Sequence, residues 1–221
     1  MKSYLKTQLM KVQLKISFEI TANLVYLQSS MIMDTLEKID YGLTKAIFTL
    51  PHNTFTDLVF LFFSFAGNFG IIWMGMFFVI FYRQVRHDPG FAIPFLGAIT
   101  LGAIITNLGL KLFFQRPRPL LGSPTTDVLT FFNSLSTHPI LKYFCGGYPT
   151  DFAFPSGHST LAFAAATAIA KQDPRHAVLS YVIASLIAFS RIYLGFHYVS
   201  DVVVGSFIGW ISALIVWRLV S

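Results

Sequence analysis

Charged residues are scarce in this sequence. Of its 221 residues, 12% are Asp, Glu, Lys or Arg, whereas 54% are hydrophobic and the mean hydropathy is +0.63. Soluble domains carry about 25% charged residues, so this composition excludes an ordinary soluble domain and indicates lipid as the solvent. At about 20 residues per membrane helix, the length is sufficient for five or six of them.

Cysteine is almost absent too, since Cys145 is the only one. A single cysteine excludes an internal disulfide and a cysteine-based metal cluster. The sequence also has no cluster of carboxylates that would suit a metal ion. We therefore predict no metal and no cofactor.

The net charge is +6, which could indicate a nucleic-acid or an anionic partner. Nucleic-acid binders gather Lys and Arg on one face, and no such run occurs here outside the loops that flank the apolar stretches. Basic residues in short loops also hold those loops in the cytosol. We therefore expect the membrane bilayer as partner, and no nucleic acid.

The N-terminal segment, residues 1–33, lacks the apolar core of a signal peptide. Residues 16–33 have the length of a span, but polar residues such as Glu19 and Asn23 make it a poor one. A weak first span, an interfacial helix and a start misplaced upstream of Met31 or Met33 all remain open. The rest, residues 34–221, is predicted to be one membrane-embedded domain.

Apolar periodicity predicts an all-α fold: a polytopic membrane bundle of five or six transmembrane helices with an interfacial amphipathic helix. Residues 34–50 have the helical spacing of the interfacial helix, which Pro51 ends. The apolar stretches are residues 55–82, 91–114, 156–170, 177–194 and 202–220. The first is predicted to be one long tilted helix, kinked near Gly67 and Asn68.

Small residues recur four apart in two of these stretches, as Ala98 with Gly102 and Gly205 with Gly209. Such pairs let helices approach closely in lipid. One connection, residues 116–155, is much longer than the others. A loop of that length in a compact domain is often functional or disordered.

Ionisable residues beside membrane spans are rare, and three groups of them occur here. The first is Lys111, Arg116 and Arg118 at the end of one stretch, where Pro117 and Pro119 force an extended exit. Snorkelling cations at a helix end would give the same pattern, so this group alone proves little.

The second group is Ser156, Gly157 and His158 at the start of a helix. Ser is a favoured N-cap, and the free N–H groups of a helix start suit a phosphate. Plain capping beside an unrelated histidine is the competing interpretation.

The third group is Ser190, Arg191, His197 and Asp201. His197 and Asp201 are four residues apart and share one face of a helix. A carboxylate on one ring nitrogen fixes the tautomer and leaves the other nitrogen free to attack. A structural ion pair at the interface is the alternative.

Together the three groups resemble the motifs of the phosphatidic acid phosphatase type 2 superfamily: Lys111-x6-Arg118-Pro119, then Pro155-Ser156-Gly157-His158, then Ser190-Arg191-x5-His197-x3-Asp201. The motifs are complete and in the family's order, and the resemblance covers roughly residues 34–220. The chain is most similar in plan to the short bacterial membrane branch, which includes undecaprenyl-diphosphate and phosphatidylglycerophosphate phosphatases.

The resemblance implies a metal-independent phosphatase. His197 would attack phosphorus to form a phosphohistidine, with Asp201 orienting its ring, and His158 would protonate the departing oxygen. The phosphoryl oxygens would be bound by Lys111, Arg118 and Arg191, by N–H groups near Ser156 and Gly157, and with support from Ser190. Arg116 falls outside the family's pattern and is interpreted as a solvated interface charge.

The predicted function is hydrolysis of a membrane lipid phosphate or diphosphate, with undecaprenyl diphosphate or a related lipid as the favoured substrate. A phosphotransferase that replaces water by another acceptor is the alternative, and a lipid transporter is a weaker one, because transport needs no His–Asp pair. Basic residues in the short loops opposite the motifs predict a plasma-membrane (inner-membrane) protein whose site faces the periplasm or the extracellular side.

Overall fold

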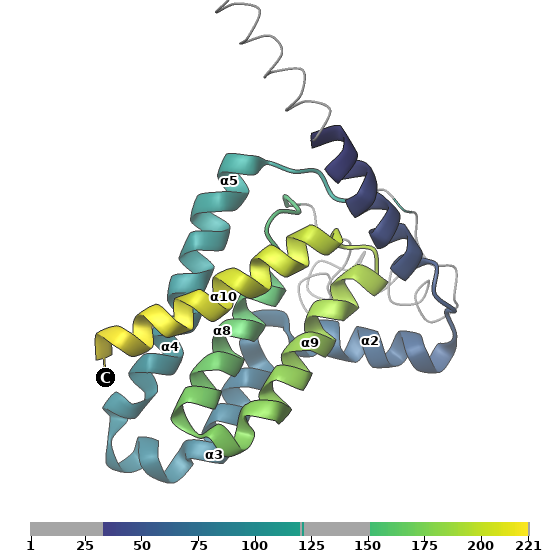
Figure 1. Cartoon of the computed structure of the whole chain (residues 1–221). Helices are drawn as coiled ribbons and strands as arrows, with labels where there is room; N and C mark the ends of the chain where they lie inside the picture. Colours follow the sequence, from purple (N-terminus) through teal and green to yellow (C-terminus); the bar gives the residue numbers. More distant parts are fainter. Residues whose placement is uncertain (1–32, 120, 122–150, 221) are drawn as a thin grey trace, which may run out of the picture. The chain divides into compact units, whose positions relative to one another are not determined.

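The computed structural model describes residues 33–119, 121 and 151–220 (Figure 1). The chain divides into two compact units, Met1–Gly42 and Leu43–Ser221, and every residue predicted for the site belongs to the second. Residues 33–48 form a helix, which confirms the helix predicted for residues 34–50. The weak span at residues 16–32 and the lone Cys145 lie outside the described residues.

The described part of the second unit is built from helices, without strands. Its α-helices are α2 (Thr54–Ala66), α3 (Ile71–His87), α4 (Ile93–Ala103), α5 (Lys111–Phe114), α8 (Gly157–Gln172), α9 (Ala177–Tyr193) and α10 (Val199–Val220). Short helices connect them: η1 (Asn68–Gly70), η2 (Pro89–Ala92), η4 (Pro174–His176) and the π-helix η3 (Ile104–Leu110). The all-α fold class is therefore confirmed for these residues.

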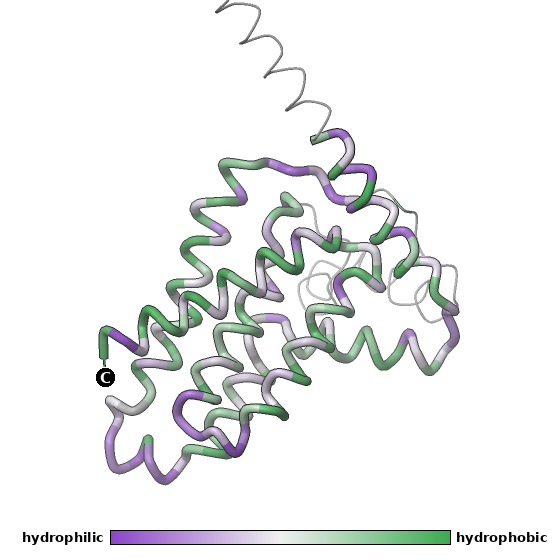
Figure 2. Tube along the Cα trace, viewed as in Figure 1, coloured by the Kyte–Doolittle hydropathy of each residue, from purple (hydrophilic) through white to green (hydrophobic). Residues whose placement is uncertain are grey.

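Three helical segments are long and apolar enough to cross a membrane, among the residues that the structure describes: Ile93–Phe114, Pro174–Tyr193 and Val199–Val220. Helix α2 is apolar but shorter. In Figure 2, hydrophobic residues run along α4 and α10, whereas hydrophilic residues gather at turns and helix ends. The chain is thus an integral membrane protein, but the predicted count of five or six spans is not reached on these criteria.

The stretch 55–82 is two helices, so the prediction of one kinked helix was wrong. Helix α2 starts at an Asn53 cap and ends at Gly67. Helix α3 begins after Gly70, which has a left-handed φ of 68°. The break brings Gly67 close to α9, where an added Cβ would lie 2.8 Å from Ile187. Only glycine fits this approach without a shift, because the space is already filled.

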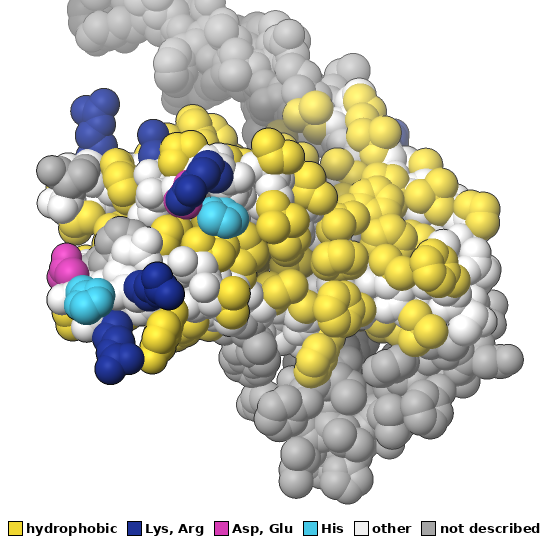
Figure 3. Space-filling model, turned by 90° about the horizontal axis from the view of Figure 1, so that it is seen from below, with side chains coloured by type: hydrophobic (Ala, Val, Ile, Leu, Met, Phe, Trp, Pro, Cys, Tyr) yellow, Lys and Arg dark blue, Asp and Glu magenta, His cyan; other side chains and the backbone are white. Residues whose placement is uncertain are grey.

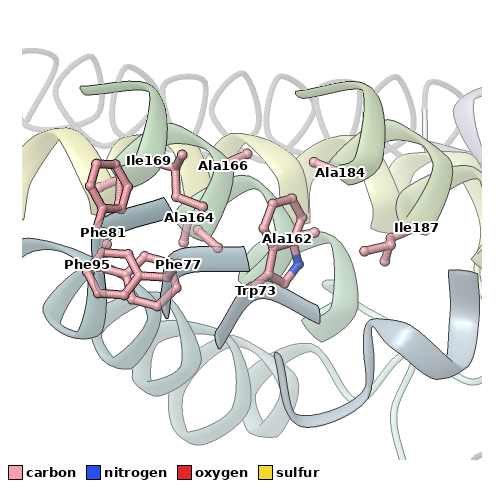
Figure 4. Packing of buried hydrophobic residues seen from close by; sticks show 14 residues of the cluster. Trp73, Phe77, Phe81, Phe95, Ala162, Ala164, Ala166, Ile169, Ala184 and Ile187 are labelled. Carbon is pink, nitrogen blue, oxygen red and sulfur yellow. The ribbon is translucent and has the colours of Figure 1, made fainter. Parts of the chain in front are cut away.

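The hydrophobic core lies between α3, α4, α8 and α9 (Figure 4). Phe77 of α3 stacks on Phe95 of α4 with ring centroids 4.2 Å apart, and Trp73 and Phe81 are also buried. Helix α8 contributes small buried side chains to this core: Ala162, Ala164, Ala165, Ala166 and Ala168. Large aromatic rings and small alanine side chains together fill the space between the helices at close packing.

Helices α8 and α10 pack with their backbones almost in contact. A Cβ on Gly209 would lie 2.1 Å from the carbonyl oxygen of Thr160, and one on Gly205 would lie 2.5 Å from that of Ser156. The predicted close approach at Gly205 and Gly209 is confirmed. It places the start of α8 beside the start of α10, where the second and third motifs lie.

Basic residues collect at the helix ends remote from the motifs. The last turns of α3, α8 and η4 carry Arg86, Lys171 and Arg175. Figure 3 views the molecule from below and shows Lys, Arg and His side chains gathered on one part of this face, beside a broad hydrophobic surface. The opposite end of α8, and the far end of α9, which follows η4, contribute residues to the candidate site.

Candidate active site

The three motifs converge on one cavity of about 220 Å³. Six predicted residues line it: Lys111, Arg118, Gly157, His158, Arg191 and His197. They come from the start of α5, the stretch after it, the first turn of α8, the last turn of α9 and the turn between α9 and α10. Gly67, Asn107, Asp151 and Leu161 complete the wall.

Arg118 organises the loops around this cavity. Its Nη1 donates to the carbonyl oxygen of Phe196 at 2.6 Å and lies 3.1 Å from Nε2 of His197. Its Nε and Nη2 donate to the backbone and the carboxylate of Asp151, at 2.9 and 2.5 Å. The buried Arg118 guanidinium therefore links the stretch after α5 to Asp151, at the end of the long connection, and to the turn before α10.

The contact with Arg118 fixes the tautomer of His197. A guanidinium has five donors and no acceptor, so Nε2 of His197 must be the acceptor and the ring proton is on Nδ1. Burial, followed by the charges of Arg118, Arg191 and Lys111, lowers the pKa of His197 well below its usual value. The ring is therefore neutral, with the lone pair of Nε2 beside the cations.

Asp201 lies on the other side of the His197 ring. Its Oδ2 is 3.4 Å from Nδ1 of His197, slightly beyond the range of about 2.7–3.2 Å for an N–H···O hydrogen bond. The same oxygen accepts the backbone N–H of Tyr198 at 2.9 Å. The predicted pairing of His197 with Asp201 is present, but the prediction that both share one helix face was wrong, because His197 lies in the turn before α10. Asp201 is fully buried.

Arg191 and Lys111 bring the other two positive charges. Arg191 is buried, donates through Nη1 to Ser64 of α2, and lies 4.5 Å from the ring centroid of Phe196. Lys111 lies in the last turn of the span Ile93–Phe114, and its Nζ pairs with Asp151. Three cations around one small cavity favour an anion with several oxygens, such as a phosphate.

His158 is held by a residue that the sequence analysis did not single out. Its Nε2 lies 2.7 Å from Oδ1 of Asn68, in the short η1 between α2 and α3. Because that amide oxygen only accepts, Nε2 of His158 carries a proton. The signal was the polar Asn68 within an apolar stretch, since such residues often mark function in membrane proteins.

Asp151 is a second residue that was not predicted. Its carboxylate bridges Lys111 and Arg118, two of the residues predicted to bind the phosphoryl oxygens. Burial raises the pKa of Asp151, but the hydrogen bonds and charges of Lys111 and Arg118 outweigh it and lower the pKa to about 2. Lying in a polar connection, Asp151 gives no periodic signal that could have identified it.

The prediction that Arg116 is a solvated interface charge was wrong. Its side chain is 20% exposed, and its Nη1 donates to Oδ1 of Asp201 and to Oγ of Ser200, both at 2.7 Å. The interpretation was wrong because the partner is 85 residues away in the sequence. Spacing along the chain cannot reveal such a pair.

The two predicted serines do not line the cavity. The Ser156 side chain caps α8 by accepting from the backbone of Ser159, and its own N–H donates to the carbonyl oxygen of Asp201 at 2.9 Å. The Ser190 hydroxyl donates to the carbonyl oxygen of Ile187. Both serines are fully buried and stabilise the segments that carry the site. Gly157, in contrast, lies at the cavity wall.

Within the described ranges, no group of three or more His, Cys, Asp or Glu side chains could hold a metal ion. The acidic residues at the site are paired with cations: Asp151 with Lys111 and Arg118, and Asp201 with Arg116. The chemistry available here is that of a neutral imidazole beside fixed positive charges.

Known proteins share parts of this sequence. Over 68 residues the chain is 37% identical to an undecaprenyl-diphosphatase of Sulfolobus acidocaldarius. This match covers 30% of this chain and 33% of that protein. Over 69 residues it is 41% identical to a lipid A 1-phosphatase of Rhizobium etli, covering 31% and 30% respectively. The matches thus span about a third of these relatives.

Two crystal structures have a similar fold over most of the chain. LpxE of Aquifex aeolicus matches with a TM-score of 0.59 and 27% identity, covering 80% of this chain and 93% of that one. A transmembrane PAP2-type phosphatidylglycerolphosphate phosphatase of Bacillus subtilis matches with a TM-score of 0.61 and 21% identity, covering 84% and 86%. At 21% identity the second likeness concerns the fold alone.

The family assignment rests on a longer match. The sequence profile of the PAP2 superfamily matches residues 91–221, more than half of the chain. These residues include all three motifs and the cations and histidines of the cavity. The chain belongs to the PAP2 superfamily.

Proposed function

We propose that this protein is a membrane lipid phosphatase that acts through a phosphohistidine on His197. The observation that carries the proposal is the contact of Arg118 with Nε2 of His197, because it requires the lone pair of that nitrogen to face the cations. A neutral imidazole with its lone pair directed at a phosphate site is an activated nucleophile. Asp201 supports the opposite nitrogen.

The reaction would run in two steps. Nε2 of His197 attacks phosphorus and the bond from phosphorus to the leaving oxygen breaks. His158, protonated on both ring nitrogens when the anionic substrate is bound, gives that oxygen the proton of Nδ1, while its Nε2–H stays on Asn68. Water then attacks the phosphohistidine, His158 takes a proton from the water, and orthophosphate leaves with His197 neutral again. The charge that develops on the phosphoryl oxygens would be stabilised by Lys111, Arg118 and Arg191.

The substrate class follows from the membrane and from the relatives. The volume of the cavity is sufficient for a phosphate group. Two of the helical segments that line it, Ile93–Phe114 and Pro174–Tyr193, are long and apolar enough to cross a membrane. The relatives are named for an undecaprenyl diphosphate and for lipid A. We therefore propose a lipid phosphate or diphosphate, with undecaprenyl diphosphate or a related lipid preferred.

Purified protein in detergent should release orthophosphate from at least one lipid of a panel: undecaprenyl diphosphate, phosphatidylglycerophosphate, phosphatidic acid, diacylglycerol diphosphate and a lipid A precursor. Release should persist in excess EDTA, because three side-chain cations supply the positive charge, and vanadate should inhibit it as a mimic of five-coordinate phosphorus. Loss of activity in EDTA that Mg²⁺ restores would contradict the metal-free mechanism. Phosphate found on an added acceptor would indicate a phosphotransferase.

We further propose that the site faces away from the cytosol, in the plasma membrane or bacterial inner membrane. The ends remote from the site carry the basic residues Arg83, Arg86, Lys171, Arg175 and Arg218. Short cytosolic loops are enriched in Lys and Arg. Four of the basic residues described at the other end are engaged in the site, so they are poor indicators of topology: Lys111, Arg116, Arg118 and Arg191.

Two introduced cysteines test this orientation in a Cys145→Ser background. Gln115→Cys lies just beyond α5 at the site end, and Lys171→Cys lies at the far end of α8; both positions are exposed. A membrane-impermeant maleimide added to intact cells, or to spheroplasts where an outer membrane exists, should label the first. Lys171→Cys should be labelled only after permeabilisation, and the reverse pattern would place the site in the cytosol.

A further inference from the structure

Arg116 lies against the predicted catalytic machinery without reaching the cavity. Its guanidinium contacts Asp201 and Ser200, and it stacks on the ring of Tyr198 with 3.8 Å from its central carbon to the ring centroid. It is not among the residues that line the cavity. Its backbone oxygen accepts the N–H of Ala153 at 2.8 Å, which anchors the stretch that carries it. A direct contact with phosphate is therefore not its role.

The two oxygens of Asp201 have different partners. Oδ1 accepts from Arg116 at 2.7 Å, whereas Oδ2 accepts from the N–H of Tyr198 and faces Nδ1 of His197. Asp201 is fully buried, and a buried carboxylate is costly unless a charge compensates it. His197 is neutral in the resting site, so it cannot provide that charge. Arg116 does, at ion-pair distance.

The protonation state of Asp201 decides which nitrogen of His197 can attack. An ionised Asp201 only accepts, so it requires the ring proton on Nδ1 and leaves the lone pair on Nε2. A protonated Asp201 would instead donate to Nδ1. The ring proton would then be on Nε2, and the nitrogen facing the cations could not attack phosphorus.

We propose that Arg116 is a positioning residue that keeps Asp201 ionised and thereby holds the proton of His197 on Nδ1. This inference rests on the proposed phosphatase function and deepens it. The positive charge of Arg116 favours the ionised form of Asp201. Ionised Asp201 holds the His197 proton on Nδ1 and so leaves the Nε2 lone pair free to attack phosphorus. Losing this charge should weaken catalysis most at low pH, where Asp201 would take up a proton.

The charges around this pair come from several elements. Asp201, in the first turn of α10, faces Arg116 from the stretch after α5 and His197 from the turn before α10. Helix α8 contributes the N–H of Ser156 to the Asp201 backbone. The His197 ring is additionally acted on by Arg118, Arg191, Lys111 and Asp151. These groups remain in place when Arg116 is replaced, so a change in pH dependence reports the loss of Arg116.

The pH dependence of kcat tests the inference. In Arg116→Gln, kcat at about pH 7 should fall about 10–100-fold, as for other residues that orient a reacting group. The acid limb of the profile should move to higher pH, so that much of kcat returns near pH 9, while KM stays within about twofold. Arg116→Lys, which keeps the charge, should retain most activity. The matched control is Arg175→Gln, which removes an 85%-exposed arginine paired with Asp173 at the other end.

Three outcomes would overturn the inference. A wild-type profile in Arg116→Gln would show that the charge is not needed. A loss of the same size at every pH would indicate a structural role alone. An increase in KM with unchanged kcat would make Arg116 a substrate contact.

A second measurement does not depend on turnover. ¹⁵N NMR of histidine-labelled protein in detergent distinguishes the two tautomers, and the His197→Ala variant assigns the His197 signals. Wild-type protein should show His197 protonated on Nδ1, and Arg116→Gln should lose this form at neutral pH. Unchanged His197 signals in Arg116→Gln would refute the inference, even if the protein hydrolysed no lipid of the panel. The proposed function is tested separately, by whether the wild-type protein hydrolyses any lipid of the panel.

Discussion

His197→Ala should abolish phosphate release, because the substitution removes the only group proposed to bond to phosphorus. Wild-type protein quenched during turnover of a lipid with labelled phosphate should carry an acid-labile, alkali-stable phosphate, as a phosphohistidine does, and the variant should carry none. Single-turnover and steady-state phosphate release from the same preparations measure the loss in rate.

The control for this experiment is His87→Ala, since His87 is an exposed histidine at the end of α3 that lies remote from the cavity. It should retain full activity. If His197→Ala retains a tenth of the wild-type rate, the residue contributes only about 1.4 kcal/mol to lowering the barrier. A contribution of that size is too small for a covalent nucleophile, and the assignment of His197 would then fail.

Gly209→Ala should destabilise the protein strongly. The added Cβ would lie 2.1 Å from the carbonyl oxygen of Thr160 and 2.8 Å from the backbone nitrogen of Ala164. These are backbone atoms of α8 that no side-chain rotation can move away, so α8 and α10 must separate. Overpacking of this kind costs about 1–3 kcal/mol and sometimes more. Thermal unfolding in detergent should show a clear decrease in the midpoint, together with loss of activity.

Gly75→Ala is the matched control for this prediction. Gly75 lies within α3, and a Cβ there would meet nothing within 4 Å. Alanine in a helix is favoured over glycine by about 0.5–1 kcal/mol, so this variant should be as stable as wild type or slightly more stable. If Gly209→Ala unfolds at the wild-type temperature, the close packing of α8 and α10 is not as described.

Much of the fold could be predicted from the sequence because the signals are local. Apolar stretches of span length predicted the helices Ile93–Phe114, Pro174–Tyr193 and Val199–Val220. The four-residue spacing of Gly205 and Gly209 predicted a close approach of another helix, which the structure identifies as α8. The four-residue spacing of His197 and Asp201 likewise placed these two side chains together.

What could not be predicted depends on contacts between distant residues. The π-helix η3 was not predicted, and the break between α2 and α3 was predicted in position, near Gly67 and Asn68, but as a kink in one helix. Asn68 meets His158 from 90 residues away, and Arg116 meets Asp201 from 85. Asp151 lies within a polar connection whose composition fits any loop. In each case the tertiary fold selects the partner.

The large separation between the two halves of the site has a consequence for biosynthesis. Arg118 contacts His197 across 79 residues, and Arg116 contacts Asp201 across 85. A chain emerges from the ribosome at about 5–20 residues per second, so several seconds pass between synthesis of the arginines and of their partners. During that time the nascent protein holds these arginines without the proposed nucleophile. The proposed hydrolysis could begin only after α10 has been synthesised, which would tie the onset of activity to the completion of the chain.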